Sequence, residues 1–223
     1  MQPLKRTERW YIAGSTGSGK STFARQIAQH IPWPLPIVVF DTKGDFLEKL
    51  PAATFKEGKE KIKGLKAGDL LRLKPLPGER ERENFDALFK QIYARKNCAV
   101  VIDELFQIDS DVLDDILTTG RSLHIPVVAC SQRPAWHTRF MLSEASRLSV
   151  FKLTDPQDRK RLRGFIGPEV EEELPNHYQW YRDLNEDTEP QILGPCAYTD
   201  TIARLPPQQP LEPPNLPGVI LWA

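Results

Sequence analysis

The segment Gly14-Ser-Thr-Gly-Ser-Gly-Lys-Ser21 constrains the fold of this chain more than any other feature of its sequence. It matches the phosphate-binding pattern G-x-x-x-x-G-K-[ST] at every position. The short apolar run from Trp10 to Ala13 precedes it, and apolar residues at helical spacing follow it from Lys20 to Ile31. A strand, a glycine-rich turn and a helix are the context in which this pattern forms a P-loop. The segment therefore predicts an α/β fold built around such a loop.

The residue types of this segment suit a nucleoside triphosphate. The glycines let the backbone fold tightly, so that several N–H groups point at phosphate oxygens, and the start of the helix adds its partial positive charge. Lys20 is predicted to reach the outer phosphates, and the Ser21 hydroxyl to bind magnesium. A flexible glycine-rich turn without a ligand is the alternative interpretation. With ATP and Mg²⁺ as ligands, the predicted nucleotide-binding residues are Gly14, Ser15, Thr16, Gly17, Ser18, Gly19, Lys20, Ser21 and Thr22.

A second pattern, Ala99-Val-Val-Ile-Asp-Glu104, ends a buried strand in two acids. In a parallel sheet this position lies at the carboxyl edge, where α/β proteins bind their ligands. Asp103 is predicted to hold magnesium together with Ser21, as the corresponding acid does in P-loop enzymes. Glu104 is predicted to orient and deprotonate the attacking water, which indicates hydrolysis. A strand that ends at an acidic surface loop is the alternative.

A third apolar strand, Val127 to Cys130, ends in Ser131-Gln-Arg-Pro134. A glutamine at the tip of the strand beside Asp103 is suited to sense the γ-phosphate or to help place water. Gln132 is therefore a candidate catalytic residue. Because polar residues commonly close strands, this pattern alone also fits a purely structural role.

The alternation of short apolar runs with helical patterns predicts βαβ units and a mostly parallel sheet with helices on both faces. Strands are expected at residues 37–40, 70–73 and 148–153, and helices at 81–96 and 110–119. A small hairpin is expected from residues 178–193, and six prolines between residues 204 and 217 predict an extended tail. The predicted division is an ATPase core (1–167), a helical turn and hairpin packed on it (168–203) and the tail (204–223).

Three further segments leave alternatives open. The lysine-rich stretch 56–66 is interpreted as a solvated loop, with a contact to the DNA backbone as the alternative. The basic residues 159–163 begin a helix that either binds phosphate or faces solvent. Trp136 either anchors the core or lies in a loop that grips a nucleic-acid strand.

Composition limits the class of protein. Thirty basic and thirty acidic residues give zero formal charge, so any contact with nucleic acid must come from local patches. No run approaches the roughly 18 apolar residues of a membrane span, and no signal peptide is expected. The three cysteines are widely spaced and odd in number. They favour reduced, buried thiols over disulfides or a zinc site.

Together these segments resemble the FtsK/HerA superfamily of DNA-pumping ATPases. Four motifs occur in the order of that family, within residues 10–165: the P-loop, Phe40-Asp-Thr-Lys-Gly-Asp-Phe46, Val100-Val-Ile-Asp-Glu104 and Ser131-Gln-Arg-Pro134. The resemblance implies a ring of five or six subunits that hydrolyses ATP at its interfaces and moves double-stranded DNA through a central channel. Arg121 lies where the family carries an arginine. It is expected to serve as an arginine finger in the neighbouring subunit's site, or else to cap helix carbonyls.

The chain looks most like the genome-packaging ATPases of tailless, membrane-containing double-stranded DNA viruses, because no membrane anchor, extra DNA-reading domain or preceding β-barrel is evident. A capsid-vertex or virion membrane protein is then a further partner, and the host cytoplasm or the packaging vertex of the virion is the expected location. Two alternatives remain. One is a small P-loop kinase, with residues 159–163 as a lid. The other is a non-translocating virus assembly or secretion ATPase.

Overall fold

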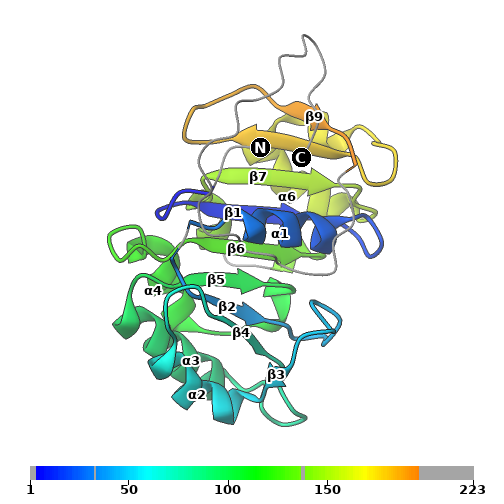
Figure 1. The fold of residues 1–223 in the computed structure, drawn as a ribbon. Coiled ribbons are helices and arrows are strands. Elements are labelled where there is room, and N and C mark those ends of the chain that lie inside the picture. Colours follow the sequence, from blue (N-terminus) through cyan, green and yellow to red (C-terminus); the bar gives the residue numbers. More distant parts are fainter. Residues whose placement is uncertain (1–3, 33, 137–138, 196–223) are drawn as a thin grey trace, which may run out of the picture.

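The structure is a computed structural model that describes residues 4–32, 34–136 and 139–195. Its described strands form a single nine-stranded sheet (Figure 1). In spatial order, the strands are β3 (Ala52–Ala53), β4 (Leu70–Leu73), β2 (Ile37–Phe40), β5 (Ala99–Ile102), β6 (Val127–Ser131), β1 (Arg9–Ala13), β7 (Arg147–Phe151), β8 (Gln179–Asp183) and β9 (Gln191–Leu193). The pairs from β3 to β7 are parallel, and β8 and β9 pair antiparallel. The predicted α/β fold with a mostly parallel sheet is confirmed.

Helices cover both faces of the sheet. Helix α1 (Lys20–Gln29) lies across β1 and β6 on one face (Figure 1). The helices that pack into the hydrophobic cluster of the other face are α2 (Phe55–Gly64), α3 (Arg82–Arg95), α4 (Asp111–Thr119), α5 (Arg139–Ser143) and α6 (Pro156–Ile166). The described residues also contain the short 3₁₀ turns η1 (Leu105–Gln107), η2 (Pro134–Trp136) and η3 (Pro168–Glu171).

Strand β1 is buried on both faces of the sheet. Trp10 and Ile12 pack with Phe23 and the other apolar residues of α1, whereas Tyr11 and Ala13 belong to the opposite cluster. Successive side chains of a strand point to opposite faces, so a strand covered on both sides reads as a continuous apolar run. This burial fixes the end of β1, and with it the start of the P-loop.

The lysine-rich stretch 56–66 is not a loop, so that interpretation was wrong. Residues 55–64 form α2, which buries Phe55 and Ile62 against the sheet. Thr54 Oγ1 accepts a hydrogen bond from the Glu57 backbone N–H, and the Glu57 carboxylate accepts one from the Thr54 N–H. This capping box starts the helix and leaves the lysines on its solvent side.

The predicted C-terminal hairpin is present. Strand β8 pairs with β7 and β9 pairs with β8, so the hairpin extends the sheet of the core. Arg147, buried in β7, lies 3.2 Å from Glu8 and 3.3 Å from Asp183, which ties the hairpin to the residue just before the first strand. The predicted tail, residues 204–223, lies outside the described residues.

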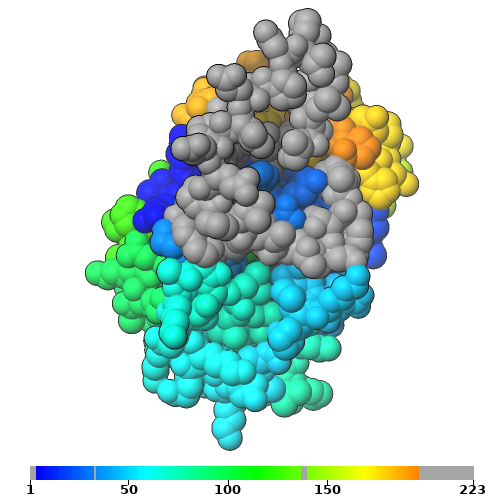
Figure 2. Space-filling view, in the orientation of Figure 1, coloured from blue at the N-terminus to red at the C-terminus, as the bar shows by residue number. Residues whose placement is uncertain are grey.

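In the space-filling view, α2 and its neighbours form the lower end of the molecule, and the hairpin lies at the upper end (Figure 2). None of the described helices combines the length and the apolar character that a membrane crossing requires. Cys98 and Cys130 are fully buried and unpaired, as predicted, whereas the third cysteine, Cys196, lies outside the described residues. Burial raises the pKa of the Cys98 thiol to about 12.

Candidate active site

Three central strands deliver the predicted site residues to one edge of the sheet. In the parallel register, Ala13 of β1 pairs with Ser131 of β6, and Ile102 of β5 pairs with Ala129 of β6. The P-loop, the acidic pair and Gln132 each follow directly after one of these strand ends. The order β5-β6-β1 therefore brings the P-loop together with the acidic pair and Gln132, which lie more than 80 residues further along the sequence.

The P-loop has the backbone geometry that only glycine adopts easily. Gly17 and Gly19 have φ values of 76° and 104°, in the left-handed region that L side chains disfavour. Gly14 is needed for space, because a Cβ there would lie 2.5 Å from Ser18 Oγ and 2.8 Å from Phe151 Cβ. The Gly14 N–H donates to the Ser131 carbonyl, and the Ser15 N–H to the Lys152 carbonyl, which fixes the loop to β6 and β7.

The start of α1 is built to receive an anion. Its N-cap residue, Gly19, supplies no side-chain hydrogen bond, and the first turn contains no acidic residue. The first amides of a helix lack intrahelical partners, so here they can bind phosphate oxygens. Lys20, at the start of the helix, is 5% exposed, and its ammonium lies 3.2 Å from Glu104 Oε1.

The predicted magnesium ligands are in contact. The Ser21 hydroxyl donates a 3.0 Å hydrogen bond to Asp103 Oδ1, and Asp103 is 1% exposed. Burial, and next the negative charge of Glu104, raise the pKa of Asp103 to about 6. The raised pKa means that the negative charge of Asp103 is unfavourable in this buried site unless a positive charge compensates it. A hard divalent cation would supply that charge, and the Asp103 carboxylate and the Ser21 hydroxyl offer it oxygen ligands.

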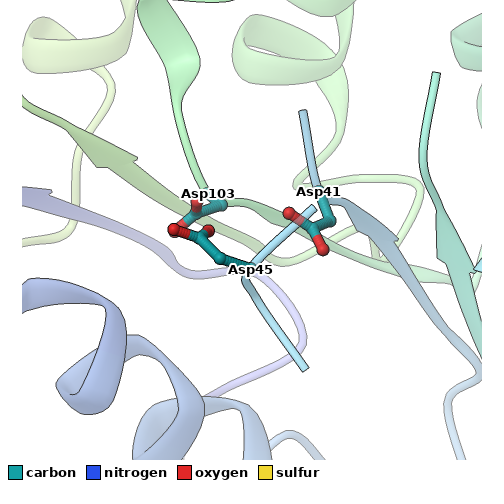
Figure 3. Close-up of side chains that lie close together, drawn as sticks. All are labelled: Asp41, Asp45 and Asp103. Atoms are coloured by element: carbon teal, nitrogen blue, oxygen red, sulfur yellow. The ribbon is translucent and has the colours of Figure 1, made fainter. Parts of the chain in front are cut away.

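Two further carboxylates lie near Asp103. One ligand oxygen from each of Asp41, Asp45 and Asp103 lies within 4.8 Å of the other two (Figure 3). Asp41 is already occupied, because Arg72 Nε donates to it at 2.8 Å and the Gly44 N–H at 2.7 Å. Asp45 is exposed, and within the described part of the chain its carboxylate has no hydrogen bond or ion pair, so it is available at the rim of the cation site.

Glu104 is the most constrained side chain of the site. Its residue exposure is 0%, and its Oε1 lies 2.6 Å from Gln132 Nε2 and 2.6 Å from Lys43 Nζ, in addition to Lys20. Gln132 Oε1 in turn accepts a 3.0 Å hydrogen bond from the Thr16 hydroxyl of the P-loop. Gln132 therefore links the phosphate loop to the acid that was predicted to act on water.

A cavity of about 410 Å³ opens beside the P-loop. Besides P-loop residues, its walls contain Phe151, His177 and Pro195, which the sequence analysis did not single out. His177 lies against the loop, since a Cβ at Gly19 would be 3.2 Å from His177 Nδ1. An aromatic wall next to a phosphate cradle suits a nucleobase, which stacks on aromatic rings. The complete lining is Gly17, Gly19, Lys20, Ser21, Thr22, Phe151, His177 and Pro195.

Arg121 is not part of this constellation. It follows α4 and precedes β6, so it lies at the amino edge of the sheet, opposite the P-loop. Its side chain is exposed, and no hydrogen bond or ion pair joins its guanidinium to the described residues. The capping of helix carbonyls therefore receives no support, and the finger role for a neighbouring subunit stays a prediction.

The structure shows the surroundings of Trp136 and of the basic segment 159–163, for which the sequence left two interpretations each. Trp136 is 65% exposed, so it does not anchor the core; it packs edge-on against Phe106 and under the guanidinium of Arg133. In the basic segment 159–163, Arg159 donates to the Leu153 carbonyl at 2.6 Å. Arg163 pairs with Glu171 at 3.1 Å. These two arginines are held by the chain itself, which weakens the case for a kinase-like lid.

With this geometry in place, comparison with known proteins identifies the family. Residues 7–118 match the family described as "Helicase HerA, central domain". The chain is also 30% identical to the DNA packaging ATPase P9 of Enterobacteria phage PRD1 over 172 residues, which cover 74% of this chain and 72% of P9. The chain belongs to the HerA/FtsK-type ATPase family. The predicted resemblance is confirmed.

Solved structures share the fold of this chain. The genome packaging NTPase B204 of Sulfolobus turreted icosahedral virus 2, in complex with AMPPCP, superposes with a TM-score of 0.66 at 16% identity. The match covers 86% of this chain and all of B204. The cytoplasmic domain of the Type VII secretion ATPase EccC from Thermomonospora curvata gives a TM-score of 0.56 at 15% identity, over 86% of this chain and 24% of EccC. At these identities the likeness concerns the fold.

Proposed function

We propose that this protein is an ATP-hydrolysing motor that translocates double-stranded DNA and packages a viral genome into a preformed capsid. One observation carries the hydrolytic part: at the P-loop, Lys20 and Gln132 both contact Glu104, and Ser21 contacts Asp103. Because Ser21 follows Lys20 and Glu104 follows Asp103 in the chain, the two sets of contacts lie side by side. The relationship to the PRD1 packaging ATPase supports the biological role.

Each residue of the cluster has a distinct task. Lys20 and the amides that begin α1 hold the triphosphate, and Ser21 and Asp103 hold the cation. Bound Mg²⁺ neutralises charge on the β- and γ-phosphates. Glu104 takes a proton from the attacking water, and Gln132 senses the γ-phosphate through its link between Thr16 and Glu104. The site works mainly by positioning and charge neutralisation.

The motor acts as a ring of five or six subunits in this proposal, with Arg121 of one subunit serving the site of the next. Double-stranded DNA is the moved partner, and a capsid-vertex or virion membrane protein holds the ring in place. The host cytoplasm and the packaging vertex of the virion are the expected locations. The buried Glu104 beside the P-loop favours hydrolysis over phosphoryl transfer to an acceptor, as in a kinase.

The test is the ATPase rate with and without double-stranded DNA, measured beside the oligomer mass. We expect turnover without any phosphoryl acceptor, a higher rate with DNA, and a mass of five or six subunits. Turnover that requires an acceptor would indicate a kinase. Turnover that DNA leaves unchanged in an assembled ring would favour an assembly or secretion ATPase that does not translocate DNA.

A further inference from the structure

Lys43 reaches into the active site from a segment to which the sequence analysis gave no catalytic role. It lies in the loop after β2, and its ammonium is 2.6 Å from Glu104 Oε1. The Lys43 side chain is 31% exposed, whereas that of Glu104 is 1% exposed. Lys43 thus extends from the surface of the molecule to a buried carboxylate that follows a different strand, β5.

The loop that carries Lys43 is fixed at the next residue, Gly44, by hydrogen bonds to its backbone. Asp41 Oδ1 accepts the Gly44 N–H at 2.7 Å, while Arg72 Nη2 donates to the Gly44 carbonyl at 2.9 Å. Arg72 also pairs with Asp41, and these two side chains are 5% and 0% exposed. Both backbone groups of Gly44 are therefore fixed by a buried ion pair. This restraint leaves little freedom in where the Lys43 side chain begins.

The two oxygens of Glu104 have different surroundings. Oε1 has three donors within 3.2 Å, namely Lys20, Lys43 and Gln132. Oε2 is buried and makes no hydrogen bond to any residue that the structure describes. A carboxylate anchored through one oxygen keeps a fixed orientation and presents the other oxygen as the acceptor.

The three donors to Oε1 differ in what else they must do. Lys20 is the P-loop lysine, whose ammonium is required by the outer phosphates of a bound nucleotide. Once Lys20 serves the phosphates, Lys43 is the remaining cation among the three donors, and Gln132 carries no charge. A buried carboxylate without a cation beside it is strongly disfavoured.

We propose that Lys43 is a positioning residue for hydrolysis. It holds Glu104 through Oε1 and supplies its counter-charge while Lys20 binds phosphate, so that Oε2 is left to accept the proton of the attacking water. The inference rests on the proposed ATPase activity and adds a residue to it. Lys43 acts through Glu104 and makes no contact with the nucleotide.

The test compares Lys43→Met, Lys43→Arg and wild type in DNA-free ATP hydrolysis and in binding of a fluorescent ATP analogue. We expect kcat of Lys43→Met to fall by about tenfold to a hundredfold, since misplacing a catalytic group costs rates of this order. KM and the Kd of the analogue should change by less than about threefold, because the phosphate cradle is intact. Lys43→Arg, which keeps the charge, should recover most of the lost rate.

Lys74→Met is the matched control. Lys74 is exposed and its side chain packs over Gly44, beside the same loop, but it makes no contact with Glu104. This variant should hydrolyse ATP at the wild-type rate. Equal losses in Lys74→Met and Lys43→Met would mean that the loop was disturbed as a whole, and would overturn the proposal.

A double-mutant cycle separates action through Glu104 from direct contact with phosphate. In a Glu104→Gln background, Lys43→Met should change single-turnover phosphate release by less than about twofold, because the carboxylate that Lys43 positions is gone. An undiminished further loss, or a tenfold weaker Kd, would assign Lys43 to the nucleotide and overturn the proposal. Full turnover of Lys43→Met would overturn this inference alone. A wild-type ring that hydrolyses no ATP would instead remove the proposed function.

Discussion

The ammonium of Lys20 and the carboxylate of Glu104 lie 3.2 Å apart, and both side chains are almost completely buried. Lys20 belongs to the phosphate cradle, and Glu104 lies just after the end of β5. Their contact means that nucleotide binding and water activation use neighbouring charges. Yet the two residues are predicted to fail in different ways when they are replaced.

Lys20→Ala should weaken nucleotide binding as well as turnover, because the ammonium contacts the phosphates in the bound state. Glu104→Gln should bind ATP and stall, with turnover lower by about 10²- to 10⁴-fold, the range expected for a lost general base. Titration of a fluorescent ATP analogue against both variants, beside phosphate release, checks this. Hydrolysis by Glu104→Gln at nearly the wild-type rate would remove Glu104 from its assigned role.

The cation site should weaken as the pH falls. The pKa of Asp103 is raised to about 6, so the ionised form that binds a cation predominates above this pH and is lost below it. At pH 5 only about a tenth of the carboxylate is ionised, which predicts a roughly tenfold weaker affinity than at pH 7.5. Binding of Mn²⁺ as a spectroscopic substitute, followed by electron paramagnetic resonance with a non-hydrolysable ATP analogue, measures this.

The matched variant for this experiment is Asp103→Asn. The nucleotide phosphates also titrate in this pH range, and any pH dependence that persists in Asp103→Asn belongs to them. We expect the variant to bind Mn²⁺ more weakly at pH 7.5 and to show a flatter profile. Profiles of equal slope in wild type and variant would contradict the role of Asp103.

His177 is predicted to bind the base of the nucleotide and to leave the phosphates unaffected. Stacking of a base on an aromatic ring is worth about 1–3 kcal/mol, so His177→Ala should weaken ATP binding by about fivefold or more. Binding of inorganic tripolyphosphate should stay unchanged, because it uses only the cradle. Competition of each ligand against a fluorescent ATP analogue checks both statements. Tyr178→Ala, an exposed neighbour that does not line the cavity, is the control.

The sequence was sufficient to predict the short buried strands. Strands β2, β4 and β5 begin and end where they are predicted. In β2 and β5 the reason is a continuous apolar run, which marks a strand covered on both faces. Helix α2 was missed because it buries few apolar side chains, although Thr54 and Glu57 are spaced as a capping box requires. That signal was present and could have been used.

The residues of the candidate site also fall into two groups, those that sequence motifs predict and those that only the structure reveals. Lys20, Ser21 and Asp103 lie in motifs whose spacing implies their chemistry, and the structure brings them together. Lys43 and His177 come from loops whose contacts depend on strand order and on the path of the chain after β7. No local pattern records either contact. The sequence could mark the loop of Lys43 as characteristic of a family, but it could not show that Lys43 reaches Glu104.

Arg121 is predicted to serve a neighbouring subunit's site. The register of β1 and β6 pairs Arg9 with Val127 at one edge and Ala13 with Ser131 at the other. Arg121 belongs to the first edge, where burial, and next the charge of Arg121, lower the pKa of Arg9 to about 10. The P-loop begins at the other edge. An exposed guanidinium that lies across the sheet from its own P-loop suits a role in trans.

Replacement of Arg121 should therefore abolish turnover without weakening nucleotide binding in the same subunit. A planar guanidinium neutralises the charge that develops on the transferred phosphoryl group, and such fingers are worth about 10³ to 10⁵ in rate. Pure rings of Arg121→Ala and pure rings of Lys20→Ala should each be inactive. If the folded, assembled Arg121→Ala ring kept its turnover within about tenfold of wild type, the finger assignment would be wrong, because that loss is far below the expected effect.

Mixing the two variants gives the decisive measurement. In mixed rings, some interfaces combine an intact Lys20 from one subunit with an intact Arg121 from its neighbour, so ATPase activity should reappear. A mixture of Lys20→Ala with Glu104→Gln is the control, because these residues contact each other within one subunit and every site then carries a defect. Recovery in the first mixture alone places Arg121 in trans. Recovery in neither mixture, in a ring that tolerates some inactive subunits when diluted with wild type, contradicts the assignment.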